Sequence, residues 1–458
     1  MDERQRSRSQ ELFRDKPVWN AIFAMAVPSC ISILVMVCYN MADMFFVGQL
    51  GDTAQVAAVS VAGPVFSLIT AVSTMIGMGG CSVIAQTAGQ GKLQEAKIYS
   101  SMCFYTAVFL GLLCTVVVLT GADSILKALG ANEEILPFAG TYMRILAAGA
   151  VVMLLPVVLA SLIRADGAVR EGLIGNLAGT AVNIVLDPIF ILALDMGVAG
   201  AAIATLIGNT VSSSFYLWYI LRKAEYLSIR PFFGNYRLKD FFHILAVGMP
   251  NGISSLLAGA ASAFSNQLLS AYGTDAIAAM AAAGKTTMVI SMLQMGICMG
   301  VQPMMAYNYG AGNKERLREI LKKLGILTLL TGSAAMFGCF FGRGAIIGMF
   351  LKNAEAAAMG ERLVIFLLIA SPVIGWYYIG TNFLQASGNA AAATVVSLTR
   401  QGIILIPCLY LMNALMGFTG IAAAHTAADV LSVIISLAVC RMKNIAGNPH
   451  QDSLASLE

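Results

Sequence analysis

The sequence predicts an all-α integral membrane protein of twelve transmembrane helices, arranged as two six-helix repeats. Hydrophobic residues make up 58% of the 458 residues and charged residues only 11%, so a soluble chain could not cover its exterior with polar groups. Long apolar segments recur along the whole chain, and one residue pattern occurs twice. Because lipid satisfies no backbone polar group, segments that cross the bilayer must be helical.

About twelve segments reach the roughly 20 apolar residues that a membrane span needs. The predicted spans are 19–47, 54–83, 98–121, 136–162, 170–194, 198–221, 242–271, 276–308, 322–342, 362–384, 391–413 and 418–440. Several exceed the minimum length, so we expect tilts, kinks or ends that protrude into water.

The two halves of the chain share an ordered series of residues, which indicates duplication. Pro28, Ile31, Ser32, Gly51, Ala54, Ala57, Met78, Gly79, Gly197, Gly200 and Ala202 recur as Pro250, Ile253, Ser254, Gly273, Ala276, Ala279, Met299, Gly300, Gly417, Gly420 and Ala422. We therefore predict an N-terminal tail at 1–16, an N-lobe at 17–222, a linker at 223–240, a C-lobe at 241–443 and a C-terminal tail at 444–458.

Basic residues predict the orientation in the membrane. One set of alternating loops holds roughly four times as many Lys and Arg residues as the other set. The positive-inside rule then places both termini and the linker in the cytoplasm, in a multi-pass protein of the cell inner membrane. No small-residue cleavage site follows the basic N-terminus, so we expect the first helix to be retained.

Several apparent chemical motifs fail on inspection. Gly284-Lys285-Thr286 resembles the end of a phosphate-binding loop, but Ala279 replaces the required first glycine and the segment is a predicted span. The nine cysteines form no close CxxC pair, and no zinc-hydrolase pattern of His and carboxylates occurs. We therefore predict no enzyme activity, cofactor, nucleotide or nucleic acid, and a monomer whose partners are lipid and a small organic substrate.

Two acidic residues lie in apolar spans of the first half only, Asp43 and Asp187. A carboxylate at the centre of a membrane helix costs roughly 2.5–3.5 kcal/mol, so both should face protein or water. Asn183 precedes Asp187 by four residues and shares its helix face, while Pro188 cannot donate to the carbonyl of Ile184. This set suits a hard cation such as Na⁺ or a proton-carrying carboxyl; a proline kink with a locally satisfied acid is the alternative.

Asp43 lies in the outer part of the first span, where an interfacial position is the alternative to an ion site. Pro28 in the same span should bend that helix between Asp43 and the cytoplasmic side.

The second half has Ser265 in place of Asp43, and keeps a proline near Ile406-Pro407 but no acid. Arg400 and Asp429 are predicted to form a structural ion pair between adjacent helices. Lys285 either lines a cavity or extends to an interface. Met288 and Met292 lie on one span with three further methionines, where they either bind apolar ligands or pack as ordinary core residues.

These residues resemble the multidrug and toxic compound extrusion (MATE) transporters, specifically their DinF-like branch. The resemblance covers roughly Pro17 to Arg441. Its most specific segments are Tyr39-Asn40-Met41-Ala42-Asp43, Val47-Gly48-Gln49-Leu50-Gly51, Arg164-Ala165-Asp166-Gly167, Asn183-Ile184-Val185-Leu186-Asp187-Pro188, Tyr307-Asn308-Tyr309-Gly310-Ala311-Gly312 and Arg400-Gln401-Gly402.

The resemblance implies two pseudo-twofold-related six-helix lobes around a V-shaped cavity. It also implies that Asp43, Asn183, Asp187 and Thr205 form an N-lobe proton or cation site, and that Pro28 is the bend of the first helix. The family's asparagine in the fourth helix is Ala160 here, which puts Na⁺ coordination in doubt. The C-lobe acids of another branch are missing, so the resemblance implies no coupling through the second lobe.

We therefore expect a secondary active antiporter that exports organic, cationic or amphipathic compounds against inward H⁺ or Na⁺ flow by alternating access. Two alternatives remain: a related flippase for a lipid-linked precursor, and a passive channel or membrane scaffold. A flippase should have a more basic cavity than Lys285 and Arg400 supply, and a channel should show no uphill accumulation.

Overall fold

The computed structural model describes residues 10–49, 53–129, 131–232, 234, 236–351 and 353–442, and every regular element within them is a helix. Ten of these helices are long and apolar enough to cross a membrane, and one bent pair makes an eleventh span. The prediction of an all-α membrane protein is therefore confirmed. Residues 1–9 and 443–458, which hold most of both predicted tails, lie outside the described residues.

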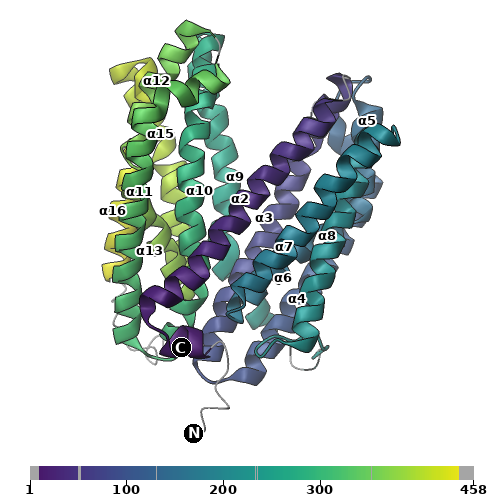
Figure 1. Cartoon of the computed structure of the whole chain (residues 1–458), viewed down its shortest axis with the longest axis vertical. Helices are drawn as coiled ribbons and strands as arrows, with labels where there is room; N and C mark the ends of the chain where they lie inside the picture. The colour runs from purple at the N-terminus through teal and green to yellow at the C-terminus, as the bar shows by residue number, and fades with distance from the viewer. Residues whose placement is uncertain are drawn as a thin grey trace. The chain divides into compact units, whose positions relative to one another are not determined.

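Contacts group the described chain into two compact units. Unit 1 contains Ile31–Gly248, and unit 2 contains Phe13–Cys30 and the described residues from Met249 onward. Two long helices, α2 (Val18–Gly48) and α9 (Leu238–Leu269), pass from one unit into the other, because a unit boundary falls inside each of them. Figure 1 shows α2 as one continuous helix.

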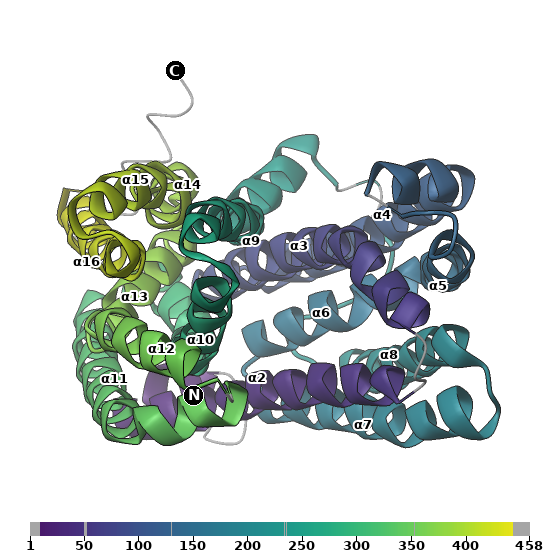
Figure 2. The same cartoon turned by 90° about the horizontal axis from the view of Figure 1, so that it is seen from above.

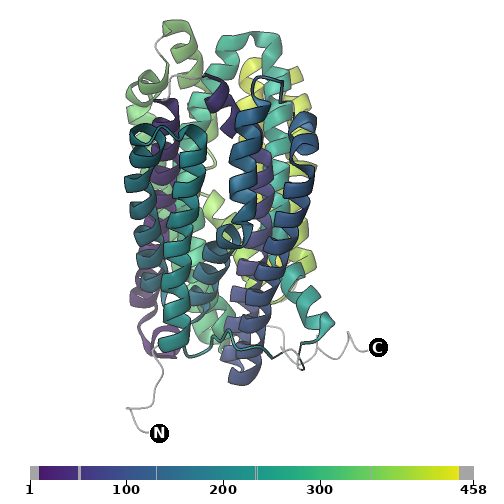
Figure 3. The same ribbon diagram turned by 90° about the vertical axis from the view of Figure 1, so that its right-hand side faces the viewer.

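Unit 1 is a bundle of long helices (Figure 3). Its further elements are α3 (Thr53–Gly89), α4 (Leu93–Ala128), α5 (Leu136–Ala148), α6 (Ala150–Ala165), α7 (Val169–Asp187), η3 (Pro188–Ala193) and α8 (Gly197–Arg222). The predicted span 136–162 is a broken helix, since α5 and α6 meet at Gly149 with a bend of 56°. A Cβ at Gly149 would meet the Leu206 side chain, which would have to move to admit any larger residue.

Unit 2 repeats this order with its own breaks. A short Glu11–Asp15 helix, η2, leads into α2, and after α9 come η5 (Ser270–Tyr272), α10 (Thr274–Gly310), α11 (Lys314–Phe350), α12 (Ala354–Leu368), α13 (Ile374–Ala386), α14 (Ala390–Leu398), η6 (Thr399–Ile403), α15 (Leu405–Met416) and α16 (Phe418–Met442). The predicted span 362–384 is interrupted by turns over residues 369–373, around Pro372. The missing donor of Pro372 is one physical reason for the break.

Both repeats carry a π-helical segment in the fifth predicted span. In unit 1 it begins at Pro188, and the N–H of Leu194 donates to Ile189 O five residues back, at 2.8 Å. In unit 2 the π segment is η6, where Ile404 N donates to Thr399 O at 3.0 Å. Such widened turns often occur at functional positions, and η3 and η6 flank the polar groups described next.

Candidate functional site

Helices α7 and α8 approach each other more closely than side chains of ordinary size would allow. A Cβ added to Gly208 would lie 2.7 Å from Gly179 O and 2.9 Å from Asn183 Cβ. Two hydrogen bonds tie the pair together: Ser212 Oγ donates to Gly175 O at 2.9 Å, and Tyr216 Oη donates to Gly172 O at 2.8 Å. Figure 2 shows α7 beside α8. Small residues thus bring the polar end of α7 against α8.

Asn183 and Asp187 lie on the α7 face that meets α8, as their spacing predicts. Both are buried, 2% and 0% exposed. In the amide orientation that satisfies both neighbours, Asn183 Nδ2 donates to Asp187 Oδ2 at 3.1 Å and Asn183 Oδ1 accepts from the Thr205 backbone N–H at 3.1 Å. The amide therefore links the acid directly to α8.

Helix α2 adds a tyrosine and a second acid to this cluster. The hydroxyls of Tyr39 and Thr205 share a hydrogen bond of 3.3 Å. One turn further along α2, Asp43 lies within electrostatic range of Asp187, and its Oδ1 is buried with no hydrogen-bond partner in the described chain. An unsatisfied buried carboxylate oxygen is costly, so this oxygen marks where a proton or cation would lower the energy.

The structure thus brings Asp43, Asn183, Asp187 and Thr205 together within unit 1. Sequence reasoning missed the Tyr39 hydroxyl as a site group, although its spacing of four from Asp43 places both on one helix face. It also missed Tyr142 on α5, which lies near both acids and packs edge-on against Phe66 with ring centroids 5.6 Å apart. Nothing in the local sequence around Tyr142 distinguishes it from a core aromatic.

The polar residues of the second half form a separate group in unit 2. Arg400 Nε lies 2.7 Å from Asp429 Oδ1, which confirms the predicted ion pair. Lys285 and Met288 are exposed on α10, Met292 is half-buried, and none of the three lines the cavity around Arg400. Their role in substrate binding stays a prediction. So does the bend at Pro28, which lies inside the continuous helix α2.

The family model described as MatE matches twice, over residues 28–189 and 250–411. The chain belongs to the MatE family. The double match confirms the duplication, since the same model covers corresponding parts of both repeats. Because MatE proteins are membrane transporters, the prediction that the chain is a transporter and no enzyme is confirmed.

Relatives with curated names support this assignment. The chain is 29% identical over 428 residues to "Multidrug export protein MepA" of Staphylococcus saprophyticus, covering 93% of this chain and 94% of that protein. The protein of the same name from Staphylococcus aureus is 29% identical over 427 residues, with the same coverage.

Solved structures show the same fold. A MATE transporter in complex with MaD3S matches with a TM-score of 0.90 at 24% identity, over 96% of this chain and 98% of that one. A transporter of the MOP superfamily from Pyrococcus furiosus matches with a TM-score of 0.89 at 23% identity, over 97% and 100%. The predicted twelve-helix, two-lobe MATE fold is therefore confirmed. The DinF-like branch stays a prediction.

Proposed function

We propose that this MatE-family chain is a secondary active antiporter that exports organic, cationic or amphipathic compounds in exchange for inward protons. The observation that carries the proposal is the buried acid cluster: Asp187 is fully buried, and Asp43 has an unpartnered buried oxygen beside it. The curated relatives are named multidrug export proteins, which favours export of drug-like compounds over movement of a lipid-linked precursor.

The hydrogen bonds of the cluster favour a proton over Na⁺. A Na⁺ ion needs several oxygen ligands, and the Asn183 oxygen already accepts from the Thr205 N–H. Ala160, on α6, supplies no amide where the family has an asparagine. A neutral carboxylic acid, in contrast, is far cheaper to bury than a carboxylate, so protonation of Asp43 or Asp187 needs no further ligands.

Proton binding can drive export only if the two conformations of the transporter bind protons with different affinity. Asp43 and Tyr39 lie on α2, whereas Asp187 and Thr205 lie on α7 and α8. Loss of one negative charge weakens the repulsion between the two acids, and α2 can then pack differently against the α7–α8 pair. We propose that this repacking lowers substrate affinity and completes the exchange.

We place the transporter in the cell inner membrane as a monomer, with both termini and the linker in the cytoplasm. The bias of Lys and Arg residues toward one set of loops supports this orientation.

The test is ethidium flux in proteoliposomes, driven separately by a pH gradient and by a Na⁺ gradient. We expect the pH gradient alone to drive uphill ethidium movement in the parent protein. Asp43→Asn and Asp187→Asn should each abolish the uphill component, because an amide cannot carry the proton. Asp123→Asn is the matched control, since Asp123 is an exposed acid of unit 1 that pairs with Arg144.

Uphill ethidium flux driven by the Na⁺ gradient would show that the coupling ion is Na⁺ and not the proton. Parental uphill flux in both Asn variants would overturn the role of the acid cluster altogether. Ethidium movement that only runs down its own gradient would indicate a channel.

A further inference from the structure

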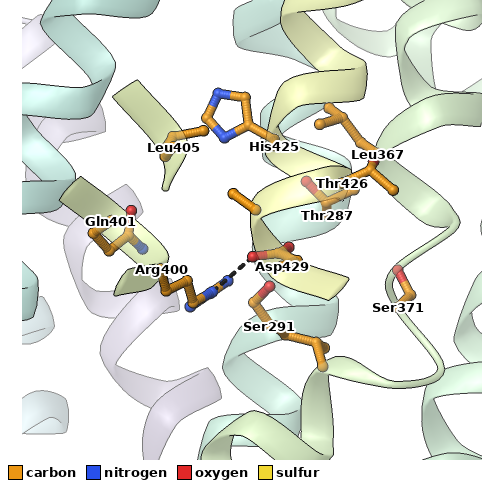
Figure 4. A pocket seen from close by; sticks show the side chains of 12 residues that line it. Thr287, Ser291, Leu367, Ser371, Arg400, Gln401, Leu405, His425, Thr426 and Asp429 are labelled. Atoms are coloured by element: carbon orange, nitrogen blue, oxygen red, sulfur yellow. Dashed lines mark hydrogen bonds and ion pairs between the residues drawn. The ribbon is translucent and has the colours of Figure 1, made fainter. Parts of the chain in front are cut away.

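A polar cavity of about 120 Å³ lies wholly within unit 2, between α10, α12, α13, η6, α15 and α16. Arg400, His425 and Asp429 line it together with hydroxyls that include Thr287 and Ser291 (Figure 4). A polar space of this volume holds several water molecules. It is therefore a place where a proton can arrive and be held inside the second repeat.

Arg400 does not depend on Asp429 alone for its stabilisation. Besides the 2.7 Å contact to Asp429, its Nη1 donates to the Tyr378 hydroxyl at 3.1 Å. Its guanidinium also lies over the rings of Tyr377 and Tyr378, 5.1 and 5.3 Å from their centroids. These cation–π contacts and the tyrosine bond hold the cation in place even when Asp429 takes another partner.

The hydrogen bonds of His425 leave one ring nitrogen able to accept a proton. Ser265 Oγ donates its only hydrogen to Ala261 O at 2.9 Å. While Ser265 keeps that bond, the 3.3 Å contact between Ser265 Oγ and His425 Nε2 has Nε2 as the donor. This assignment leaves Nδ1 of the neutral imidazole with its lone pair.

His425 occupies the position in unit 2 that corresponds to Thr205 of the N-lobe site. The alignment that matches Gly197 with Gly417 also matches Thr205 with His425, and Ser265 is the counterpart of Asp43. In unit 1, Thr205 bonds to Tyr39 on α2, and in unit 2, His425 bonds to Ser265 on α9. The second repeat thus keeps a polar contact at the same place with different chemical groups.

We propose that this cavity is a second proton-binding site, with His425 as the proton acceptor and Asp429 as the group that stabilises the imidazolium. A hydronium ion in the cavity water transfers its proton to Nδ1: one O–H bond breaks, one N–H bond forms, the hydronium becomes water, and the ring charge goes from zero to +1. Asp429 lies four residues along the same helix and therefore on the same face. The inference rests on the proposed proton-coupled antiport, to which it adds a second titrating group.

The charged groups that act on His425 come from two elements: Asp429 from α16 and Arg400 from η6. Tyr377 and Tyr378 of α13 lie against Arg400. Among the described residues that line the cavity or bond to the ring, α9 and α10 contribute only hydroxyls: Ser265, Thr287 and Ser291. Burial of the ring and the charge of Arg400 both oppose the imidazolium, whereas Asp429 favours it, so removal of either charge should shift the proton occupancy in a known direction.

The first test observes the imidazole directly and needs no transport. The chain has three histidines, His243, His425 and His450, so nitrogen NMR of histidine-labelled protein in detergent can resolve each ring. His425→Gln identifies the resonance by its loss and keeps a donor for Ser265. We expect the His425 ring to change from the Nε2–H form to the doubly protonated form as the pH is lowered below about 6.5.

Asp429→Asn should reduce protonation of His425 at each pH, and Arg400→Gln should increase it. Should Asp429→Asn fail to fold, Arg400→Gln supplies the opposite shift. A His425 ring that stays neutral at every pH at which the parent protein stays folded would overturn the proposal.

The second test counts protons. Ethidium binding is measured by calorimetry in buffers of different ionisation enthalpy, which yields the number of protons released per bound ethidium. His425→Gln should lower that number by about half relative to the parent, because one of two linked sites is lost. An unchanged proton count in His425→Gln would reject the C-lobe site, while absence of pH-driven ethidium flux in the parent would reject the proposed antiport instead.

Discussion

At the residue level, Asp166 shows how a buried carboxylate holds the linker on unit 1. It follows α6 and is 2% exposed. Its oxygens accept from the Tyr219 hydroxyl at 2.8 Å and from the backbone N–H groups of Glu225 and Tyr226 at 3.1 and 2.8 Å. One acid therefore satisfies backbone donors at the point where the chain leaves α8. Burial raises the pKa of Asp166 to about 7 from 3.8, against the lowering effect of these donors.

This raised pKa predicts a defined pH dependence of stability. Between pH 3.8 and about 7 the folded protein holds a proton on Asp166 that the unfolded chain has released. Stability therefore falls as pH rises through that window, by up to about 1.4 kcal/mol per pH unit, and levels off above it. Asp166→Asn lacks this titration and keeps an oxygen for the two N–H groups.

Thermal unfolding in detergent at several pH values tests this prediction. The Tm of the parent minus the Tm of Asp166→Asn should decrease from pH 5 to pH 7, whereas the same difference for the exposed control Asp123→Asn should stay constant. A constant difference for Asp166→Asn would show that Asp166 is ionised in the folded protein throughout.

At the level of single elements, the close approach of α7 and α8 determines the geometry of the acid cluster. Gly208→Ala would place a Cβ 2.7 Å from Gly179 O and 2.9 Å from Asn183 Cβ, so α7 must move away from α8. We expect a loss of about 1–3 kcal/mol in stability, together with weaker pH-driven flux, because the bond between Asn183 and the Thr205 N–H is stretched.

Gly63→Ala in α3 is the matched control, since no atom lies within 4 Å of a Cβ there. Alanine at that position should raise stability by up to about 1 kcal/mol through its higher helix propensity. Thermal unfolding and ethidium flux check both variants. Equal behaviour of the two would mean that the α7–α8 contact tolerates a methyl group.

At the level of the whole molecule, the exchange of half-helices between the units is the dominant feature. The short helix η2, which leads into α2, is held in unit 2, where Phe13 O accepts from Asn308 Nδ2 at 3.0 Å and from Arg316 Nε at 2.8 Å. The first part of α9 is held in unit 1, where a Cβ at Gly248 would collide with Met75 O. The boundaries fall after Cys30 and after Gly248, within two residues of Pro28 and Pro250.

Two repeat-related glycines support this arrangement. Gly79 lies against Ile244 O of α9 within unit 1, and its counterpart Gly300 lies 2.8 Å, measured from an added Cβ, from Met25 O of α2 within unit 2. The same glycine contact thus occurs once in each unit. In unit 1 the partner helix is α9, and in unit 2 it is the repeat-related helix α2. Each prolyl ring lacks an N–H and weakens its helix near the point where it changes unit, so the two prolines are the expected hinges.

Replacement of these prolines should slow the conformational change without weakening substrate binding. Pro28→Ala and Pro250→Ala each restore a backbone donor and stiffen the helix, so pH-driven ethidium flux should fall while the ethidium Kd stays at the parental value. Pro64→Ala is the control, because Pro64 lies inside α3, which belongs to unit 1 alone. An equal loss of flux in Pro64→Ala would contradict a special role for the two boundary prolines.

Periodicity and composition were sufficient for the helical class, the duplication and the number of spans, because backbone hydrogen bonding in lipid leaves no alternative to helices. Two residue pairs could also be predicted from the sequence. The spacing of four places Asn183 beside Asp187, and opposite charge pairs Arg400 with Asp429. The interruption near Pro372 and the bend at Gly149 could not be predicted, because a straight span and a broken span have the same apolar composition.

The sequence by itself determined what must lie in the membrane and which of its polar residues are too costly to be idle. Only the tertiary structure decided that Tyr39 meets Thr205, that Ser265 meets His425, and that α2 and α9 each change unit midway. Those contacts join segments far apart in the chain, and close packing at small residues such as Gly179, Gly208 and Gly300 sets them. The hydropathy of a span reveals that it is buried in lipid or protein, but carries no information on which neighbour it touches.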